Sequence, residues 1–306
     1  MTDSAPSSGR LPDFLLIGGM KCGSTSLHDQ LVTHPQLAEP QYKEPGFFSR
    51  DERFELGIDW YRSIFASATD DQLLFESSTC YTRHPHFGDV AARIHEHLPD
   101  IKLIYIMRHP VDRLYSHYRH AMLEGAGNRT PVISLDAALA SSDEYFDTGC
   151  YLRQIEQFTE HYPRDRFFFL TLHELKTDPD AVLGELQRFL GLDVVEGLGS
   201  KKGPSNQIKA RATSSNASGL KARLQRNPLV RLVKQAVPVP VRARIMRTVM
   251  DSPLVRARMQ AKTDAFMAQL SPLSDAKRAE LLVRYEAPNR ALADFLGRDL
   301  PDSWAG

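Results

Sequence analysis

The stretch that most constrains the fold of this chain runs from residue 14 to residue 28 and reads FLLIGGMKCGSTSLH. Its first four residues are apolar, which is typical of a short strand buried in a parallel sheet. Two glycines follow, and Leu27 and Leu31 then recur at helical spacing. A strand, a glycine-rich turn and a helix in this order place backbone N–H groups at a helix N-terminus, where they can hold a phosphate group.

The spacing of Gly18 and Gly23 in this stretch is that of a P-loop with one change. The position after the second glycine holds Ser24, and the lysine has moved into the loop as Lys21. In nucleoside triphosphatases the lysine after the glycine reaches the β- and γ-phosphates. The loop therefore predicts a 5′-phosphate site for a nucleotide that has no γ-phosphate. The alternative is a glycine turn that binds nothing.

Apolar runs and helical patterns alternate as far as residue 192, which predicts an α/β fold: a P-loop-like parallel sheet flanked by helices. We expect strands at 14–17, 73–75, 101–107 and 166–171, and helices at 24–33, 87–98, 111–123, 151–162 and 179–190. Beyond 197 the sequence predicts a long loop, a basic helical region over 220–262 and an amphipathic helix over 274–297.

Composition limits the partners and the domain organisation. Lys plus Arg equals Asp plus Glu at 38 each, so we expect no nucleic-acid partner, and any anion site must be local. Residues 1–10 are expected to form a disordered leader, and residues 11–306 a single domain in which 197–262 is a lid or acceptor-binding region. The alternative for 220–262 is a solvated helix face. No apolar run is long enough to span a bilayer, and three widely spaced cysteines fit a reducing compartment, so we expect a cytoplasmic protein.

A second anion site is predicted where the strand 101–107 ends in Arg108. The helix that follows carries Arg113 and Ser116, and ligands of open parallel sheets bind outside the carboxyl ends of the strands. An arginine can clamp a phosphate and a hydroxyl can donate to the same group, whereas a magnesium-using enzyme would place an aspartate here. Two such sites favour a nucleotide phosphorylated at both the 5′ and 3′ positions. The alternative is that Arg108 only pairs with Asp112.

These motifs together resemble those of the sulfotransferases that use 3′-phosphoadenosine 5′-phosphosulfate (PAPS), in particular the branch of the heparan sulfate sulfotransferases and their bacterial relatives. KCGSTSL at 21–27 is similar to the 5′-phosphosulfate loop of that family. RHPVDRLYSHY at 108–118 is similar to its 3′-phosphate motif, R-x-P-x-x-R-x-x-S-x-Y, and KEPGFF at 43–48 to its K-E-x-x-F-F turn. The resemblance covers about residues 13–193.

The resemblance implies transfer of a sulfuryl group from PAPS to a hydroxyl or amine of a glycan, glycolipid or other metabolite, with adenosine 3′,5′-bisphosphate as the product and no metal. Glu44 would be the general base, with Lys43 and Lys21 as the other catalytic residues. The donor would be held by Lys21, Cys22, Gly23, Ser24, Thr25, Ser26, Arg108 and Ser116, and by Lys201, Lys202 and Gly203 of a closing loop. The polar residues Glu76, Ser77 and Ser78 stand at another strand end and are candidates for binding the acceptor.

Two other classes of function stay open at this point. One is a P-loop kinase that uses ATP and magnesium on a small metabolite, and the other is a nucleotide-binding protein without catalytic activity. The sequence does not identify the acceptor or the oligomeric state. Cys22 has no base that the sequence can assign to it, which favours a packing role over a nucleophilic one.

Overall fold

The computed structural model describes residues 9–127, 131–199 and 253–304, and these divide into two compact units. The sheet unit comprises the described residues of 9–116, 142–199 and 274–304, and the helical unit those of 117–127, 131–141 and 253–273. Each unit is described here by itself. The single domain expected over residues 11–306 stays a prediction, and the leader expected at 1–10 lies mostly outside the described residues.

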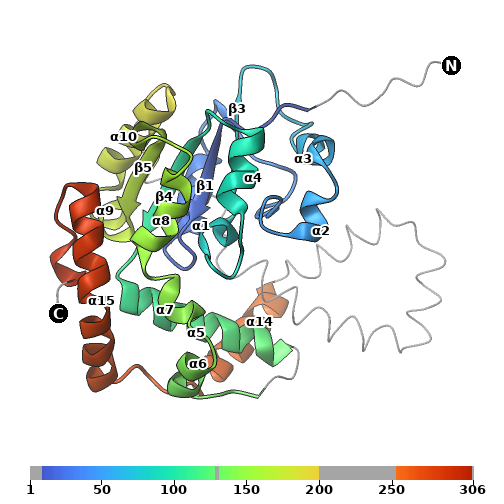
Figure 1. Ribbon diagram of the computed structural model, residues 1–306. Coiled ribbons are helices and arrows are strands. Elements are labelled where there is room, and N and C mark those ends of the chain that lie inside the picture. The colour runs from blue at the N-terminus through green and yellow to red at the C-terminus, as the bar shows by residue number, and fades with distance from the viewer. Residues whose placement is uncertain (1–8, 128–130, 200–252, 305–306) are drawn as a thin grey trace, which may run out of the picture. The chain divides into compact units, whose positions relative to one another are not determined.

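The sheet unit is built on five parallel strands in the order β2-β3-β1-β4-β5 (Figure 1). This arrangement confirms the predicted fold class. The strand β3 continues two residues beyond its predicted end, so Glu76 and Ser77 belong to the strand itself. The strands are β1 (Phe14–Gly18), β2 (Leu37–Ala38), β3 (Leu73–Ser77), β4 (Lys102–Met107) and β5 (Phe167–Thr171).

The helices predicted at 24–33, 87–98, 111–123, 151–162, 179–190 and 274–297 are present, with ends that differ by a few residues, and four short helices outside these predicted ranges accompany them among the described residues of this unit. In the sheet unit they are α1 (Ser24–Leu31), α2 (Asp51–Phe54), α3 (Ile58–Ser63), α4 (Val90–His97), the first part of α5 (Pro110–Gly127), α7 (Glu144–Asp147), α8 (Tyr151–Thr159), α9 (Leu172–Thr177), α10 (Pro179–Leu190) and α15 (Asp275–Leu296), with short 3₁₀ turns η1 (Thr79–Thr82), η2 (Arg164–Arg166) and η3 (Asp302–Trp304).

Aromatic contacts show which helices cover each face of the sheet. On one face, His28 of α1 lies against Phe75 of β3, and Phe189 of α10 lies against Phe168 of β5. On the other face, Tyr151 of α8 contacts Tyr105 of β4, and Phe295 of α15 contacts Phe169 of β5. Burial of these faces on both sides explains the nearly continuous apolar runs of the central strands, and the burial of apolar surface is the main force that holds the layers together.

Local signals in the sequence set several helix ends. The side chain of Asp178 accepts a hydrogen bond from the backbone N–H of Ala181, Pro179 occupies the first turn of α10, and Gly191 ends that helix with φ 81°. Such residues satisfy or avoid the backbone groups that a helix end leaves without partners. The start and the end of α10 can therefore be predicted from the sequence.

The helical unit contains the end of α5, α6 (Leu135–Ser141) and α14 (Pro253–Met267). The hydroxyl of Tyr118 donates to the carbonyl of Ile133 at 2.7 Å, which ties α5 to the segment before α6. Of the basic region predicted to be helical, residues 253–262 lie within α14, and 220–252 lie outside the described residues. Within the described ranges, no helix combines the length and the apolar character needed to cross a bilayer.

Candidate active site

The phosphate loop, residues 19–23, connects β1 to α1 at the carboxyl edge of the sheet. The N–H of Gly19 donates to the carbonyl of Ile106 at 2.6 Å, so the loop is tied to the neighbouring strand β4. Lys21 and Gly23 have positive φ angles of 66° and 99°. A Cβ at Gly23 would lie 2.6 Å from Cδ1 of Leu172, so a side chain there meets both backbone strain and a clash. The second glycine of the motif is therefore required by the turn.

The hydroxyl residues of the motif open helix α1, which begins at Ser24. Ser24 is buried, Thr25 is half-buried and Ser26 is exposed. No acidic residue stands in the first turn, so the N-terminal N–H groups and the positive end of the helix dipole meet no carboxylate of their own helix. The start of α1 therefore has the features that the predicted anion site needs, and anion binding there stays a prediction.

The thiol of Cys22 points into the protein, where it lies 3.4 Å from the hydroxyl of Tyr151. Burial raises the pKa of Cys22 above its ordinary value, although the Tyr151 hydroxyl and the charges of Arg113 and Arg108 oppose this shift. A buried thiol that resists ionisation is a poor nucleophile. The position fits the packing role that the sequence favours.

Arg108, immediately after β4, lies beside the phosphate loop. Its Nη1 donates to the carbonyl of Lys21 at 3.4 Å, and its side chain is 31% exposed. Its carboxylate neighbour Asp112 is 3.9 Å away, whereas Arg278 of α15 approaches the same carboxylate to 2.6 Å. The geometry is therefore compatible with Arg108 as a phosphate ligand and with Arg108 as an ion-pair partner of Asp112. Asp112, however, makes its shorter contact with Arg278.

Tyr151, the first residue of α8, connects the loop to Arg108. Its hydroxyl donates to the carbonyl of Arg108 at 2.5 Å and accepts from the N–H of the same residue at 3.2 Å. The same hydroxyl lies against the Cys22 thiol. No local pattern in the sequence links Tyr151 to Arg108, because the two residues stand 43 positions apart.

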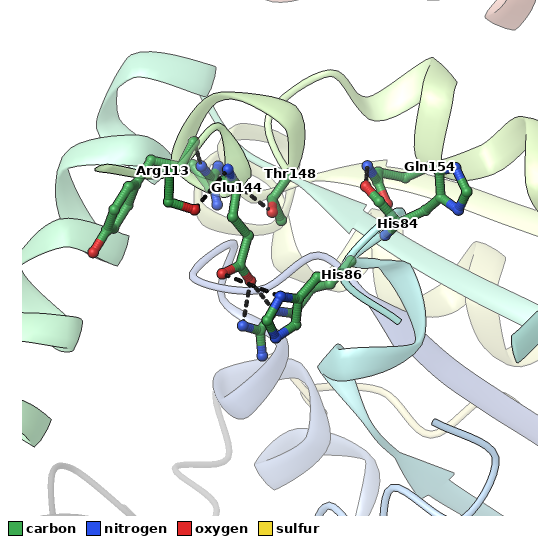
Figure 2. Close-up of polar contacts among 9 residues, drawn as sticks. His84, His86, Arg113, Glu144, Thr148 and Gln154 are labelled. Atoms are coloured by element: carbon green, nitrogen blue, oxygen red, sulfur yellow. Dashed lines mark hydrogen bonds and ion pairs between the residues drawn. The ribbon is translucent and has the colours of Figure 1, made fainter. Parts of the chain in front are cut away.

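Ser116, the other member of the predicted 3′-phosphate motif, lies on α5 and is half-buried. Arg113 on the same helix is fully buried, and its Nη2 donates to the carbonyl of Tyr145 in α7. Figure 2 shows this arginine beside the segment that carries Glu144 and Thr148. Arg113 therefore holds the start of α5 against α7 rather than facing solvent.

The turn of residues 43–46, which carries the predicted base, lies over the end of β3. Lys43 and Glu44 are half-buried, Glu44 has φ 55° and Gly46 has φ 60°. The N–H of Gly46 donates to the hydroxyl of Ser78 at 2.9 Å. Phe47 and Phe48 are fully buried and anchor the far side of the turn.

Glu76, on β3, is fully buried beneath this turn. Its Oε2 accepts from the hydroxyl of Ser78 at 2.9 Å and its Oε1 from the hydroxyl of Tyr81 at 2.5 Å. Burial raises the pKa of Glu76 to about 7; the hydroxyls of Tyr81, Ser78 and Tyr61 lower it, and the charge of Glu44 raises it further. Glu76 and Ser78 are thus brought to the 43–46 turn, but neither exposes surface to an acceptor.

Ser77 turns to the opposite face of β3, where it meets His28 of α1. The Nδ1 atom of His28 lies 2.8 Å from the hydroxyl of Ser77, and its Nε2 lies 2.7 Å from a carboxylate oxygen of Glu39. His28 and Ser77 are both buried. The structure therefore separates Ser77 from its sequence neighbours Glu76 and Ser78, because successive residues of a strand point to opposite faces.

His84 and His86, which follow η1, belong to a polar cluster with residues of α7 and α8 (Figure 2). The amide of Gln154 accepts from the N–H of His84 at 2.7 Å and donates to its carbonyl at 2.9 Å. The Nδ1 atom of His86 lies 3.9 Å from Glu144, which also pairs with Arg83. These contacts fix the chain after β3 against α7 and α8.

Three predicted donor contacts, Lys201, Lys202 and Gly203, lie outside the described residues. For the rest, the structure gathers two groups: the phosphate loop with Arg108, and the 43–46 turn with Glu76 and Ser78. Ser78, directly after β3, also contacts β1, since its N–H donates to the carbonyl of Leu16 at 3.2 Å.

Comparison with known proteins gives matches of one kind. The family described as the sulfotransferase domain matches residues 11–223. Human heparan sulfate glucosamine 3-O-sulfotransferase 6 is 32% identical over 200 residues, covering 62% of this chain and 55% of that protein. Human bifunctional heparan sulfate N-deacetylase/N-sulfotransferase 3 is 33% identical over 205 residues, covering 60% of this chain and 22% of that protein. This chain thus spans between a fifth and about half of the length of these relatives.

Among solved structures, a sulfotransferase from Alicyclobacillus acidocaldarius matches with a TM-score of 0.53 and 25% identity. The match covers 71% of this chain and 97% of that protein. The family match extends over more than half of the sequence. The chain belongs to the sulfotransferase domain family.

Proposed function

We propose that this protein transfers a sulfuryl group from PAPS to a hydroxyl or amine of an acceptor. The observation that carries the proposal is the contact between Arg108 and the phosphate loop, which puts a guanidinium group 3.4 Å from the Lys21 carbonyl. Two cationic side chains at adjacent strand ends suit a nucleotide that carries phosphate groups on both its 5′ and 3′ oxygens.

In this proposal the phosphate loop and the start of α1 hold the 5′-phosphosulfate through backbone N–H groups, Lys21 and the hydroxyls of Ser24, Thr25 and Ser26. Arg108 and Ser116 hold the 3′-phosphate. Lys201, Lys202 and Gly203 remain candidates for closing over the nucleotide.

The transfer step needs a base and a place for developing negative charge. The acceptor oxygen or nitrogen forms a bond to sulfur, the bond between sulfur and the 5′-phosphate oxygen breaks, and the acceptor proton passes to the carboxylate of Glu44. Lys21 stabilises the charge that gathers on the departing phosphate, and Lys43 stabilises the sulfuryl oxygens. The leaving product is adenosine 3′,5′-bisphosphate.

The names of the relatives favour a glycan or glycoconjugate acceptor, since both act on heparan sulfate by name. A lipid or another metabolite with a hydroxyl or amine fits the same chemistry. The cytoplasmic location expected from sequence is retained as part of the proposal.

Calorimetric titration with adenosine 3′,5′-bisphosphate in magnesium-free buffer, beside a titration with ATP and magnesium, tests the donor assignment. We expect adenosine 3′,5′-bisphosphate to bind more tightly than ATP with magnesium. Arg108→Ala should weaken bisphosphate binding by about tenfold or more and so remove the preference for a 3′-phosphate, because one charge-assisted hydrogen-bonded pair is lost. Tighter binding of ATP with magnesium would support a kinase instead.

Turnover of labelled PAPS then tests catalysis, first with water and afterwards with a panel of glycan, glycolipid and small-molecule acceptors. A non-catalytic nucleotide-binding protein would bind the bisphosphate but form no sulfated product. It would also be insensitive to Glu44→Gln in every assay.

A further inference from the structure

We infer that Glu76 is a positioning residue that holds the 43–46 turn, and with it Glu44, in place through the hydroxyls of Ser78 and Tyr81. The inference rests on the proposed function in one respect, namely that Glu44 is the base. It assigns Glu76 a role different from the direct acceptor contact that its place at a strand end suggests.

Two parallel connections join the buried carboxylate to the turn and its anchor. In the first, the N–H of Gly46 donates to Ser78 at 2.9 Å, and Ser78 donates to Glu76 at 2.9 Å. In the second, the N–H of Phe48 donates to the hydroxyl of Tyr81 at 3.5 Å, and Tyr81 donates to Glu76 at 2.5 Å. Each hydroxyl therefore accepts a hydrogen bond from one backbone N–H, that of Gly46 in the turn or of Phe48 in its anchor, and donates one to an oxygen of Glu76.

The direction of these bonds follows from the chemistry of their members. A backbone N–H can only donate, so the oxygens of Ser78 and Tyr81 act as acceptors toward the turn. Their own hydrogens are then directed to Glu76, which must accept on both oxygens. An ionised carboxylate does this, whereas a protonated one carries an O–H that competes with one of the two hydroxyl donors.

Burial and the charge of Glu44 disfavour the charge of Glu76, whereas the hydroxyls of Tyr81, Ser78 and Tyr61 favour it. The titratable groups that influence Glu76 or feel its charge come from the turn and the residue before it, from α3 and from η1: Tyr42, Glu44, Tyr61, Cys80 and Tyr81. The balance of burial against hydroxyl donors brings its pKa to about 7. As the pH falls through this value, Glu76 gains a proton and one of the two connections to the turn is weakened.

Glu76→Gln tests the connection without changing the size of the side chain. A glutamine amide oxygen can accept one of the two hydroxyl donors, but its NH₂ group cannot accept the other. The matched control is Tyr162→Phe, which removes a buried phenol that donates to the carbonyl of Leu98 at 2.9 Å, at the amino ends of β4 and β5 and away from the turn.

The first readout is hydrogen exchange of the Gly46 and Phe48 amides between pH 6 and pH 8, expressed as protection factors. In the wild type we expect protection of both amides to rise with pH through about 7. In Glu76→Gln we expect at least a tenfold lower protection at pH 8 and no such rise, with the strand amides of β4 unchanged. This readout requires no enzymatic activity.

The second readout is PAPS turnover as a function of pH. We expect kcat of the wild type to fall as the pH drops through about 7, and Glu76→Gln to lack this limb and to show about a tenfold lower kcat at pH 8, the equivalent of one lost charge-assisted hydrogen bond. The Kd for adenosine 3′,5′-bisphosphate should stay within about twofold of the wild type, because the donor site does not include Glu76.

Ser78→Ala keeps the experiment decisive if the glutamine variant does not fold. It should lower the protection of the Gly46 amide at every pH and leave the Phe48 amide responsive to pH. The inference is overturned if Glu76→Gln and Tyr162→Phe protect the two amides equally and share the pH profile of the wild type. If the amides respond as expected but the wild type neither binds the bisphosphate nor turns over PAPS, the proposed function fails and the structural connection stands.

Discussion

The hydroxyl of Tyr151 and the main chain of Arg108 share two hydrogen bonds, one in each direction. The hydroxyl donates to the carbonyl at 2.5 Å and accepts from the N–H at 3.2 Å. Because the same hydroxyl touches the Cys22 thiol, one aromatic side chain sets both the loop and the strand end that the donor would contact.

Tyr151→Phe should therefore weaken binding of adenosine 3′,5′-bisphosphate by about fivefold, since a hydrogen bond of this kind contributes about 1 kcal/mol. Calorimetric titration measures the change, with Tyr162→Phe as the matched control that keeps wild-type affinity. Equal affinities for the two variants would contradict a role for Tyr151 in ordering the site.

The charge of Asp112 should oppose the phosphate binding proposed for Arg108. Burial raises the pKa of Asp112, but the hydrogen bond and charge of Arg278, with His109 and Arg108, bring it below its ordinary value, so Asp112 is ionised at neutral pH. Asp112→Asn should tighten bisphosphate binding about two- to fivefold at low salt.

Arg278→Ala should act in the opposite direction, because Asp112 then has Arg108 as its main cationic neighbour. Both effects should shrink in 0.5 M salt, where surface charges are screened over about 4 Å. Changes of the same sign in the two variants, or changes that salt does not reduce, would exclude this electrostatic explanation.

Glu44→Gln should lower kcat by about 10²- to 10⁴-fold, the range expected for loss of a general base, with little effect on bisphosphate affinity. It should also lower the pKa of Glu76, because the charge of Glu44 is one of the causes that raise it. A pH titration of the Glu76 carboxyl by NMR measures the second effect. Glu55→Gln, at an exposed glutamate after α2, is the control and should change neither quantity.

The pKa of Glu76 also makes the stability of the protein depend on pH. The pKa is about 7 when folded and about 4.5 in an ordinary solvent-exposed state, so the folded protein binds the proton more tightly. Global unfolding exposes Glu76 to water, whereas local opening of the 43–46 turn leaves it on the buried strand β3, so the two processes respond to pH in opposite directions. The wild-type free energy of global unfolding should fall as the pH rises from about 4.5 to about 7, by at most about 3 kcal/mol from this group.

Glu76→Gln removes this dependence, so its free energy of unfolding relative to the wild type should increase between pH 5 and pH 8. Urea unfolding at a series of pH values measures the difference. A difference that stays constant over this range would show that Glu76 is not the group that titrates.

Sequence alone determined four of the five strands, the glycine-rich loop after β1 and the position of Arg108. These features depend on residues close together in the chain: an apolar run followed by Gly18 and Gly23, or a strand that ends in an arginine before Pro110. Backbone conformation and strand burial respond mainly to such local patterns, so spacing was enough to place them.

Only the tertiary structure decided which polar side chains support the site. Glu76, Ser77 and Ser78 are consecutive, yet Glu76 and Ser78 meet the 43–46 turn while Ser77 meets His28 on the other face of β3. Tyr151 reaches Arg108 from 43 residues away. The packing of helices on the sheet selects such partners, and the local sequence around a residue does not predict which distant residues will contact it.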